Sequence, residues 1–134
     1  MKIVVVEDEP KVLQLMQMHL KLRGHEVSGC DTGKEALQSL EQQKPQLMLL
    51  DMWLKDDISG KIVLGQAKSL SPSTAVIIMT GDEEVSQEEV TKLGGAALLR
   101  KPVRLDDLDA AVAKVAERLP APQSSGQAGQ PTSP

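Results

Sequence analysis

The chain has 134 residues, with 15 lysines and arginines against 19 aspartates and glutamates, and a formal net charge of -4. This length predicts one domain with a real core, and the acidic balance argues against direct nucleic-acid binding, because such sites are usually basic. The apolar runs are far shorter than the roughly 20 residues of a membrane span and no signal-peptide pattern is present, so we expect a soluble, cytoplasmic protein without membrane contact.

Four apolar, strand-like runs are each followed directly by polar residues. The runs and their polar successors are residues 3–6 with Glu7 and Asp8, residues 46–50 with Asp51, residues 75–79 with Thr80, and residues 96–100 with Lys101. In an open parallel α/β sheet the carboxyl ends of the strands meet at one edge, and ligands bind where the strand order reverses. Three acids, one hydroxyl and one lysine are therefore expected to converge.

Segments with helical spacing separate these runs, which indicates βαβ units and a parallel sheet. A third helix is expected from Ser59 or Gly60 to Leu70, just before Pro72, and the fifth shows the clearest helical period. The apolar residues at helical spacing are Val12, Leu13, Leu15, Met16 and Leu20 in the first helix, Ala36, Leu37 and Leu40 in the second, and Leu105, Leu108, Val112, Val115 and Leu119 in the fifth. In the third helix, Ile62, Val63 and Ala67 are the candidates for the inner face.

The fourth helix is predicted from about Glu84 to Leu93 and has a thin apolar stripe. Its only large apolar anchors are Val85, Val90 and Leu93. Weak anchoring fits a moving element, and it fits a merely solvated helix equally well.

The composition changes after residue 119. Residues 120–134 offer almost nothing apolar to bury, so we expect a disordered tail behind a domain spanning residues 1–119. The tail is either a linker to an output domain or the end of a stand-alone protein.

A set of short motifs recurs in order along the domain. They are Glu7-Asp8-Glu9, Gly24-His25-Glu26-Val27, residues 32–37, Asp51, Thr80-Gly81, residues 93–96 and Lys101-Pro102. Together they resemble the receiver domain of two-component response regulators, from Met1 to about Leu119. The resemblance implies a flavodoxin-like, doubly wound α/β fold with five parallel strands in the order 2-1-3-4-5 and five helices.

The resemblance also implies a Mg²⁺ site. Asp8 and Asp51 would bind the metal directly, Glu7 would act through bound water, and the backbone carbonyl of Trp53 would complete the protein's share. Carboxylate oxygens suit Mg²⁺, and without a cation the crowded acids would repel one another. Read singly, Glu7 and Asp8 could instead be acids near the start of the first helix, where negative charge is favoured.

By the same resemblance, Asp51 is the nucleophile that forms an aspartyl phosphate, while Thr80 and Lys101 each engage a phosphoryl oxygen. Phosphoryl transfer depends mainly on positioning and charge neutralisation, which these groups supply. Read singly, Thr80 could be an ordinary strand-end hydroxyl and Lys101 a surface charge.

The implied function is a signalling switch, and not a conventional enzyme, that catalyses its own phosphorylation and dephosphorylation. The phosphoryl group would come from a sensor histidine kinase, a phosphotransfer protein or a small donor such as acetyl phosphate, and a downstream output domain or protein would respond. The alternative is an atypical receiver that acts as an interaction module without phosphorylation. A metal-dependent phosphohydrolase is disfavoured, because no second acid stands two residues after Asp51.

Three departures from the common receiver pattern concern the predicted site. Lys55 replaces the usual proline after Asp51 and the stretch to Gly60 has one extra residue, which predicts a longer, acidic and less rigid loop. The usual switching aromatic falls at Leu98, and the chain has no Phe or Tyr. Trp53 either shields the phosphoryl group from water or lies along the surface.

The remaining candidates have structural interpretations. Cys30 is interpreted as a buried thiol and not a redox sensor, and His19 and His25 as surface or packing residues. The last helix has a broad apolar arc, which fits either a homodimer contact or plain helix propensity. The arc consists of Val112, Val115, Ala110, Ala111, Ala113 and Ala116.

Overall fold

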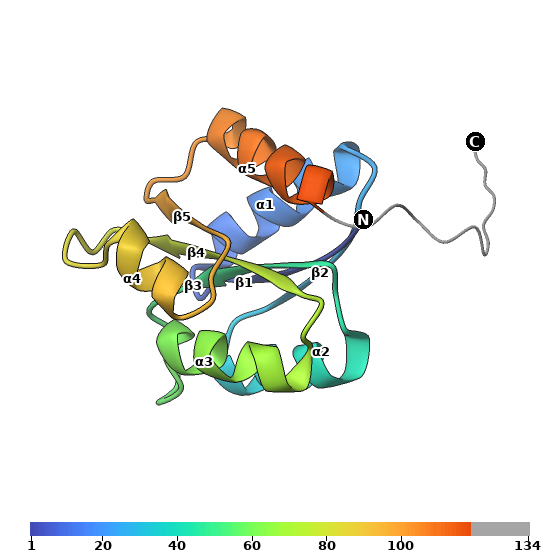
Figure 1. Ribbon diagram of the computed structural model, residues 1–134. Coiled ribbons are helices and arrows are strands. Elements are labelled where there is room, and N and C mark those ends of the chain that lie inside the picture. The colour runs from blue at the N-terminus through green and yellow to red at the C-terminus, as the bar shows by residue number, and fades with distance from the viewer. Residues whose placement is uncertain (119–134) are drawn as a thin grey trace.

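Strands and helices alternate along residues 1–118, which are the residues that the computed structural model describes (Figure 1). The elements are β1 (Lys2–Val6), α1 (Pro10–Leu22), β2 (Glu26–Cys30), α2 (Gly33–Gln43), β3 (Leu47–Asp51), α3 (Gly60–Leu70), β4 (Ala75–Thr80), α4 (Gln87–Lys92), β5 (Ala97–Arg100) and α5 (Leu105–Arg118). All strand pairs are parallel, and the sheet order is β2-β1-β3-β4-β5. The predicted fold class and strand order are confirmed.

The central strands β1, β3 and β4 are buried on both faces, which explains why they read as continuous apolar runs, whereas the edge strands β2 and β5 are only partly buried. Helices α1 and α5 cover one face, and α2 and α3 cover the other (Figure 1). Successive strand residues point to opposite faces, so Ile3 and Val5 pack with α1 and α5, whereas Val4 and Val6 join the core beneath α2 and α3.

The register of the strands brings their polar ends together. Val6 pairs with Leu50 across β1 and β3, so Glu7 and Asp51 continue from neighbouring positions. Asp51 in turn pairs with Met79, which places Thr80 one step beyond it on the adjacent strand. The geometry of a parallel sheet therefore gathers the predicted residues at one edge.

Helix α3 begins at Gly60, with Ser59 as its N-cap. The prediction that Ile62 lies on the inner face was wrong, because this side chain is 45% exposed. Leu64 takes its place beside Val63 and Ala67, since these three share the side of the helix that meets the sheet.

Helix α4 is shorter than predicted, and its expected start at Glu84 was wrong. Ser86 Oγ accepts a hydrogen bond from Glu89 N at 3.0 Å and so caps the helix two residues later. Asp82 Oδ1 instead accepts from Glu84 N at 2.9 Å, which holds the preceding residues in a turn. Val85 and Val90 still anchor this segment in the core.

Helix α5 is the longest described helix, with 14 residues ending at Arg118. Leu119 and the predicted tail at 120–134 lie outside the described residues. Within residues 1–118, no helix combines the length and apolar character needed to cross a bilayer.

Two glycines of α3 predict opposite effects of substitution by alanine. A Cβ on Gly60 would lie 2.3 Å from the Asp51 carbonyl oxygen and 2.8 Å from Met52 Cα, so Gly60→Ala should lower the free energy of unfolding by roughly 1–3 kcal/mol. A Cβ on Gly65 meets no atom within 4 Å, so Gly65→Ala should raise it by about 0.5–1 kcal/mol. Urea denaturation of both variants tests the pair, and equal effects would contradict the packing described here.

Candidate functional site

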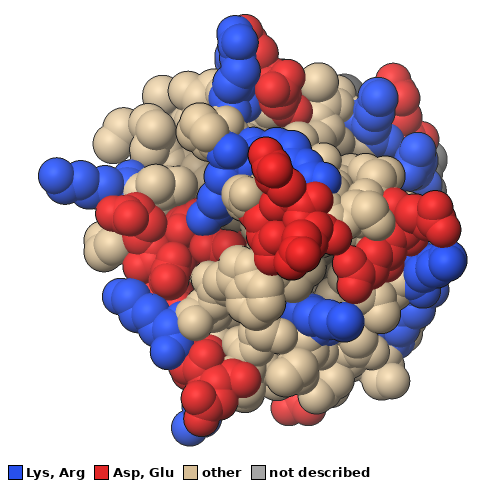
Figure 2. Space-filling view, turned by 90° about the vertical axis from the view of Figure 1, so that its left-hand side faces the viewer, with Lys and Arg blue, Asp and Glu red and all other residues tan. Residues whose placement is uncertain are grey.

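An acidic cluster occupies the carboxyl edge of the sheet. Glu7 follows β1, Asp8 comes next, and Asp51 ends the neighbouring strand β3; one oxygen of each lies within 4.8 Å of the others. Glu7 and Asp51 are buried, at 0% and 3% exposure, while Asp8 is half-buried. Figure 2 shows the side of the molecule on which α4 lies, with acidic side chains at its centre and flanks and basic side chains between them.

Lys101 bridges two of these carboxylates. Its Nζ lies 2.8 Å from Asp51 Oδ2 and 2.8 Å from Glu7 Oε1. Burial alone lowers the pKa of Lys101, but hydrogen bonds and negative charge from Asp51 and Glu7 raise it above its usual value overall. The following Lys101–Pro102 peptide bond is cis. One ammonium thus pairs with two carboxylates of a three-acid cluster, and negative charge remains in excess when all three acids are ionised.

These residues fit a hard divalent cation. Glu7 Oε1 is fully buried, and its polar contact among the described residues is the ion pair with Lys101 Nζ at 2.8 Å, an ammonium that Asp51 shares. A carboxylate oxygen can accept from more than one partner, and burying it with few partners costs free energy. A hydrated Mg²⁺ would satisfy it and would offset the excess charge, because this ion prefers carboxylate oxygens and retains several waters.

Thr80 lies at the end of β4 and is 1% exposed. Its Oγ1 accepts a hydrogen bond from Asp82 N at 3.0 Å, so the hydroxyl is tied to the loop that leads into α4. Arg100 holds the same loop by donating to the carbonyl oxygens of Asp82, at 2.7 Å, and Val85, at 2.6 Å. Sequence analysis missed this role of Arg100, because no local pattern identifies backbone partners 15 and 18 residues away.

The loop after Asp51 places Trp53 beside the nucleophile candidate. Trp53 N donates to Asp51 Oδ1 at 3.1 Å, while the indole side chain is 57% exposed. Farther along, Asp56 accepts hydrogen bonds from the backbone of α2, and Lys55 Nζ lies 3.7 Å from Asp31 Oδ2. The loop that was predicted to be less rigid is therefore anchored at both of these points.

Comparison with known proteins identifies the family. The model of the response regulator receiver domain matches residues 3–113. The chain belongs to this family. Among solved structures, the signal receiver domain of a putative LuxO repressor protein from Vibrio parahaemolyticus is 30% identical with a TM-score of 0.78, covering 87% of this chain and 89% of that one. A receiver domain from Clostridium thermocellum is also 30% identical, with a TM-score of 0.79 and coverage of 87% and 94%.

Curated relatives are longer than this receiver domain. The alkaline phosphatase synthesis transcriptional regulatory protein PhoP of Bacillus subtilis is 33% identical over 128 residues, which span 92% of this chain and 52% of PhoP. The transcriptional regulatory protein ZraR of Escherichia coli K12 is 31% identical over 113 residues, or 84% of this chain and 25% of ZraR. The chain thus spans about half of the first relative and a quarter of the second.

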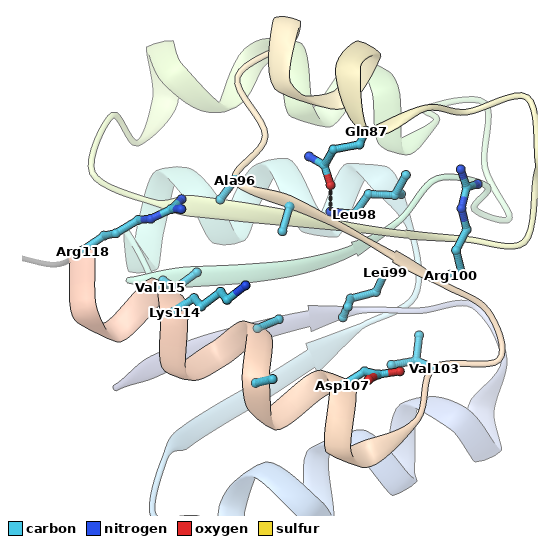
Figure 3. A pocket seen from close by; sticks show the side chains of 13 residues that line it. Gln87, Ala96, Leu98, Leu99, Arg100, Val103, Asp107, Lys114, Val115 and Arg118 are labelled. Carbon is cyan, nitrogen blue, oxygen red and sulfur yellow. Dashed lines mark hydrogen bonds between the residues drawn. The ribbon is translucent and has the colours of Figure 1, made fainter.

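A hollow of the receiver domain lies away from the acids, between β5 and α5. It has a volume of about 450 Å³, and none of the three acids lines it. Figure 3 shows Gln87 of α4 at its rim, where the side-chain oxygen accepts from Leu98 N at 3.2 Å. Leu98, at the position of the usual aromatic, packs against the core beneath α3.

The predicted apolar arc of α5 divides into an inner and an outer part. Val112 and Val115 are buried against the sheet. The alanines differ, since Ala111 is half-buried and the other three are exposed. A homodimer contact on this helix stays a prediction.

The cysteine and the histidines lie apart from the acidic cluster. Cys30 is 8% exposed, and burial together with the charge of Glu35 raises its pKa to about 12, which confirms a buried thiol. His19 Nε2 lies 2.8 Å from Asp109 Oδ1 on α5, and His25 Nδ1 lies 3.0 Å from the N-terminal amine. Both histidines have the structural contacts expected of them.

The excess negative charge predicts that removing one acid stabilises the metal-free protein. Asp8→Asn should raise the free energy of unfolding by on the order of 1 kcal/mol in chelator, because it relieves repulsion within the cluster. The same variant should lose most of the stabilisation that millimolar Mg²⁺ gives to the wild type.

Thermal unfolding with and without Mg²⁺ measures both effects of Asp8→Asn. Glu9→Gln is the matched control, since exposed Glu9 is adjacent in sequence but outside the cluster. A metal-free Asp8→Asn protein that is less stable than the wild type would contradict the charge argument.

Proposed function

We propose that this receiver domain is a phosphorylation-controlled signalling switch in which Asp51 accepts the phosphoryl group. The observation that carries the proposal is the setting of Asp51. Its carboxylate ends a central strand, is almost fully buried, and has Lys101 Nζ at 2.8 Å and two further acids within reach of one cation.

Mg²⁺ would be held by Asp8 and Asp51 directly, by Glu7 through water, and by the backbone carbonyl of Trp53. When bound, the cation supplies positive charge that offsets the charge of the phosphoryl group. The fully buried Glu7 carboxylate, which shares one ammonium with Asp51, and the grouping of three carboxylates support this assignment.

The transfer itself uses the side chains of this chain. An Asp51 carboxylate oxygen attacks phosphorus, and the bond between phosphorus and the donor's nitrogen or oxygen breaks, its electron pair leaving with the donor. Lys101, which pairs with Asp51 before transfer, shifts its ammonium to a phosphoryl oxygen. Thr80 donates its hydroxyl proton in a hydrogen bond to another phosphoryl oxygen. In dephosphorylation a water oxygen attacks phosphorus, the bond between phosphorus and the Asp51 oxygen breaks with its electron pair returning to the carboxylate, and inorganic phosphate leaves with the protons of the water.

Phosphorylation would be transmitted through the loop between β4 and α4. Thr80 is hydrogen-bonded to Asp82 in this loop, so movement of the hydroxyl toward the phosphoryl group displaces the loop. Helix α4 has only 6 residues, which makes it easy to shift toward a partner-binding position. Because Leu98 replaces the usual aromatic, switching relies on Thr80, this loop and α4.

The proposed upstream partner is a sensor histidine kinase or a phosphotransfer protein, and the proposed downstream partner is an output domain or protein. Several longer relatives are named transcriptional regulatory proteins, which supports a regulatory output. We propose that this chain acts in the cytoplasm without touching nucleic acid or membrane, with homodimerisation as one form of output.

The rival function is an interaction module that does not use phosphate. Leu98 and the extended loop after Asp51 favour it, since both depart from the usual switching pattern. Phosphorylation of Asp51 decides between the two functions.

Intact-mass spectrometry after incubation with Mg²⁺ and acetyl phosphate tests the proposal. The wild type should gain the mass of one phosphoryl group, while Asp51→Asn and chelator-treated protein should not. Lys101→Ala should react on the order of 100-fold more slowly, because it lacks the cation that meets the phosphoryl oxygen. Equal modification of wild type and Asp51→Asn, or an unmodified wild type that binds Mg²⁺, would contradict the proposal.

A further inference from the structure

The loop between β3 and α3 is hydrogen-bonded to α2, a helix that it does not adjoin in the sequence. Asp56 Oδ1 accepts a hydrogen bond from Gly33 N at 2.9 Å, and Asp56 Oδ2 accepts one from Lys34 N at 3.0 Å. The donors are the first two backbone N–H groups of α2, which have no acceptor within their own helix. Asp56 therefore caps α2 with both carboxylate oxygens at the N-terminus of the helix, where negative charge is favoured.

A further contact, between Ile58 and Gly33, seats the loop on this helix end. A Cβ added to Gly33 would lie 2.3 Å from the Ile58 carbonyl oxygen and 2.6 Å from Ile58 Cβ, so the chains approach as closely as glycine permits. Hydrogen bonds from Gly33 and Lys34 lower the pKa of Asp56. The cap is therefore an ionised carboxylate at neutral pH.

The same loop carries the proposed metal-binding carbonyl. Its first residues are fixed to the strand end, where Trp53 N donates to Asp51 Oδ1 at 3.1 Å and Gly60 N donates to Met52 O at 2.8 Å. Asp56 follows Trp53 by only three residues. With one end held at Asp51 and the other on α2, the backbone of Trp53 has little freedom to move.

We propose that Asp56 is a positioning residue that holds the Trp53 backbone beside Asp51 by docking the loop onto α2. The proposal rests on the proposed function, in which the Trp53 carbonyl contributes to the Mg²⁺ site. Groups that orient ligands in this way commonly change metal affinity by about 10- to 100-fold when they are removed.

The test compares Asp56→Ala with two matched variants. Thr32→Ala removes the other cap of α2, since Thr32 Oγ1 accepts from Glu35 N at 3.1 Å, without touching the loop. Asp57→Asn removes the same charge one residue away. Asp56→Asn keeps one carbonyl oxygen as an acceptor and should recover part of any loss.

Two readouts separate positioning from helix stability. In metal-free protein, amide hydrogen exchange across residues 52–58 should be faster in Asp56→Ala than in Thr32→Ala or Asp57→Asn. In a Mg²⁺ titration followed by Trp53 fluorescence, Asp56→Ala should bind about 10-fold more weakly than the wild type. Both control variants should bind within a factor of about two of the wild type.

Equal loop exchange and equal Mg²⁺ affinity in Asp56→Ala and Thr32→Ala would overturn the proposal and reduce Asp56 to a helix cap. Equal weakening by Asp57→Asn would show that charge alone is responsible. A wild type that binds no Mg²⁺ would contradict the proposed function instead. The exchange comparison in metal-free protein would still decide whether Asp56 fixes the loop.

Discussion

The contact between one ammonium and two buried carboxylates dominates the electrostatics of the candidate site in this receiver domain. Lys101 Nζ lies 2.8 Å from both Asp51 and Glu7, and Asp8 adds a third carboxyl group to the same small region. A single lysine cannot balance three ionised acids, so the metal-free site opposes folding through like-charge repulsion. The imbalance is a reason to expect a cation at this edge of the sheet.

The parallel sheet positions the site residues at one edge, and two loops beside that edge complete the candidate site. Strand register sets Asp51 beside the end of β1 and one step before Thr80, with both faces of the sheet held by helices. Around this rigid edge, two loops are tied down by long-range contacts: Arg100 holds the loop after Thr80, and Asp56 holds the loop after Asp51. In the proposed function, the loop after Thr80 moves when the Thr80 hydroxyl turns to the phosphoryl group. The loop after Asp51 instead keeps the Trp53 backbone in place.

Sequence predicted β1, β3 and β4 and their polar ends well, because burial on both faces leaves continuous apolar runs such as those that stop at Asp51 and Thr80. The edge strand β2 is mostly not buried and has no such run. The strand order came from family resemblance, since apolar patterning does not fix it. Helix detail failed where a local signal was overridden: Ser86 caps α4 in place of an earlier start, and Ile62 faces solvent. Asp56 could not be predicted, because its bonds join backbone amides 22 and 23 residues away.

A crystal structure grown with Mg²⁺ and beryllium fluoride, which mimics a phosphoryl group, would test the central claim most directly. The account predicts that beryllium is bonded to an Asp51 carboxylate oxygen, with Lys101 and Thr80 each contacting a fluorine. It also predicts a metal ion bound by Asp8, Asp51 and the Trp53 carbonyl. Density for the metal or the beryllium fluoride at another place, or an Asp51 adduct that Lys101 does not approach, would contradict it.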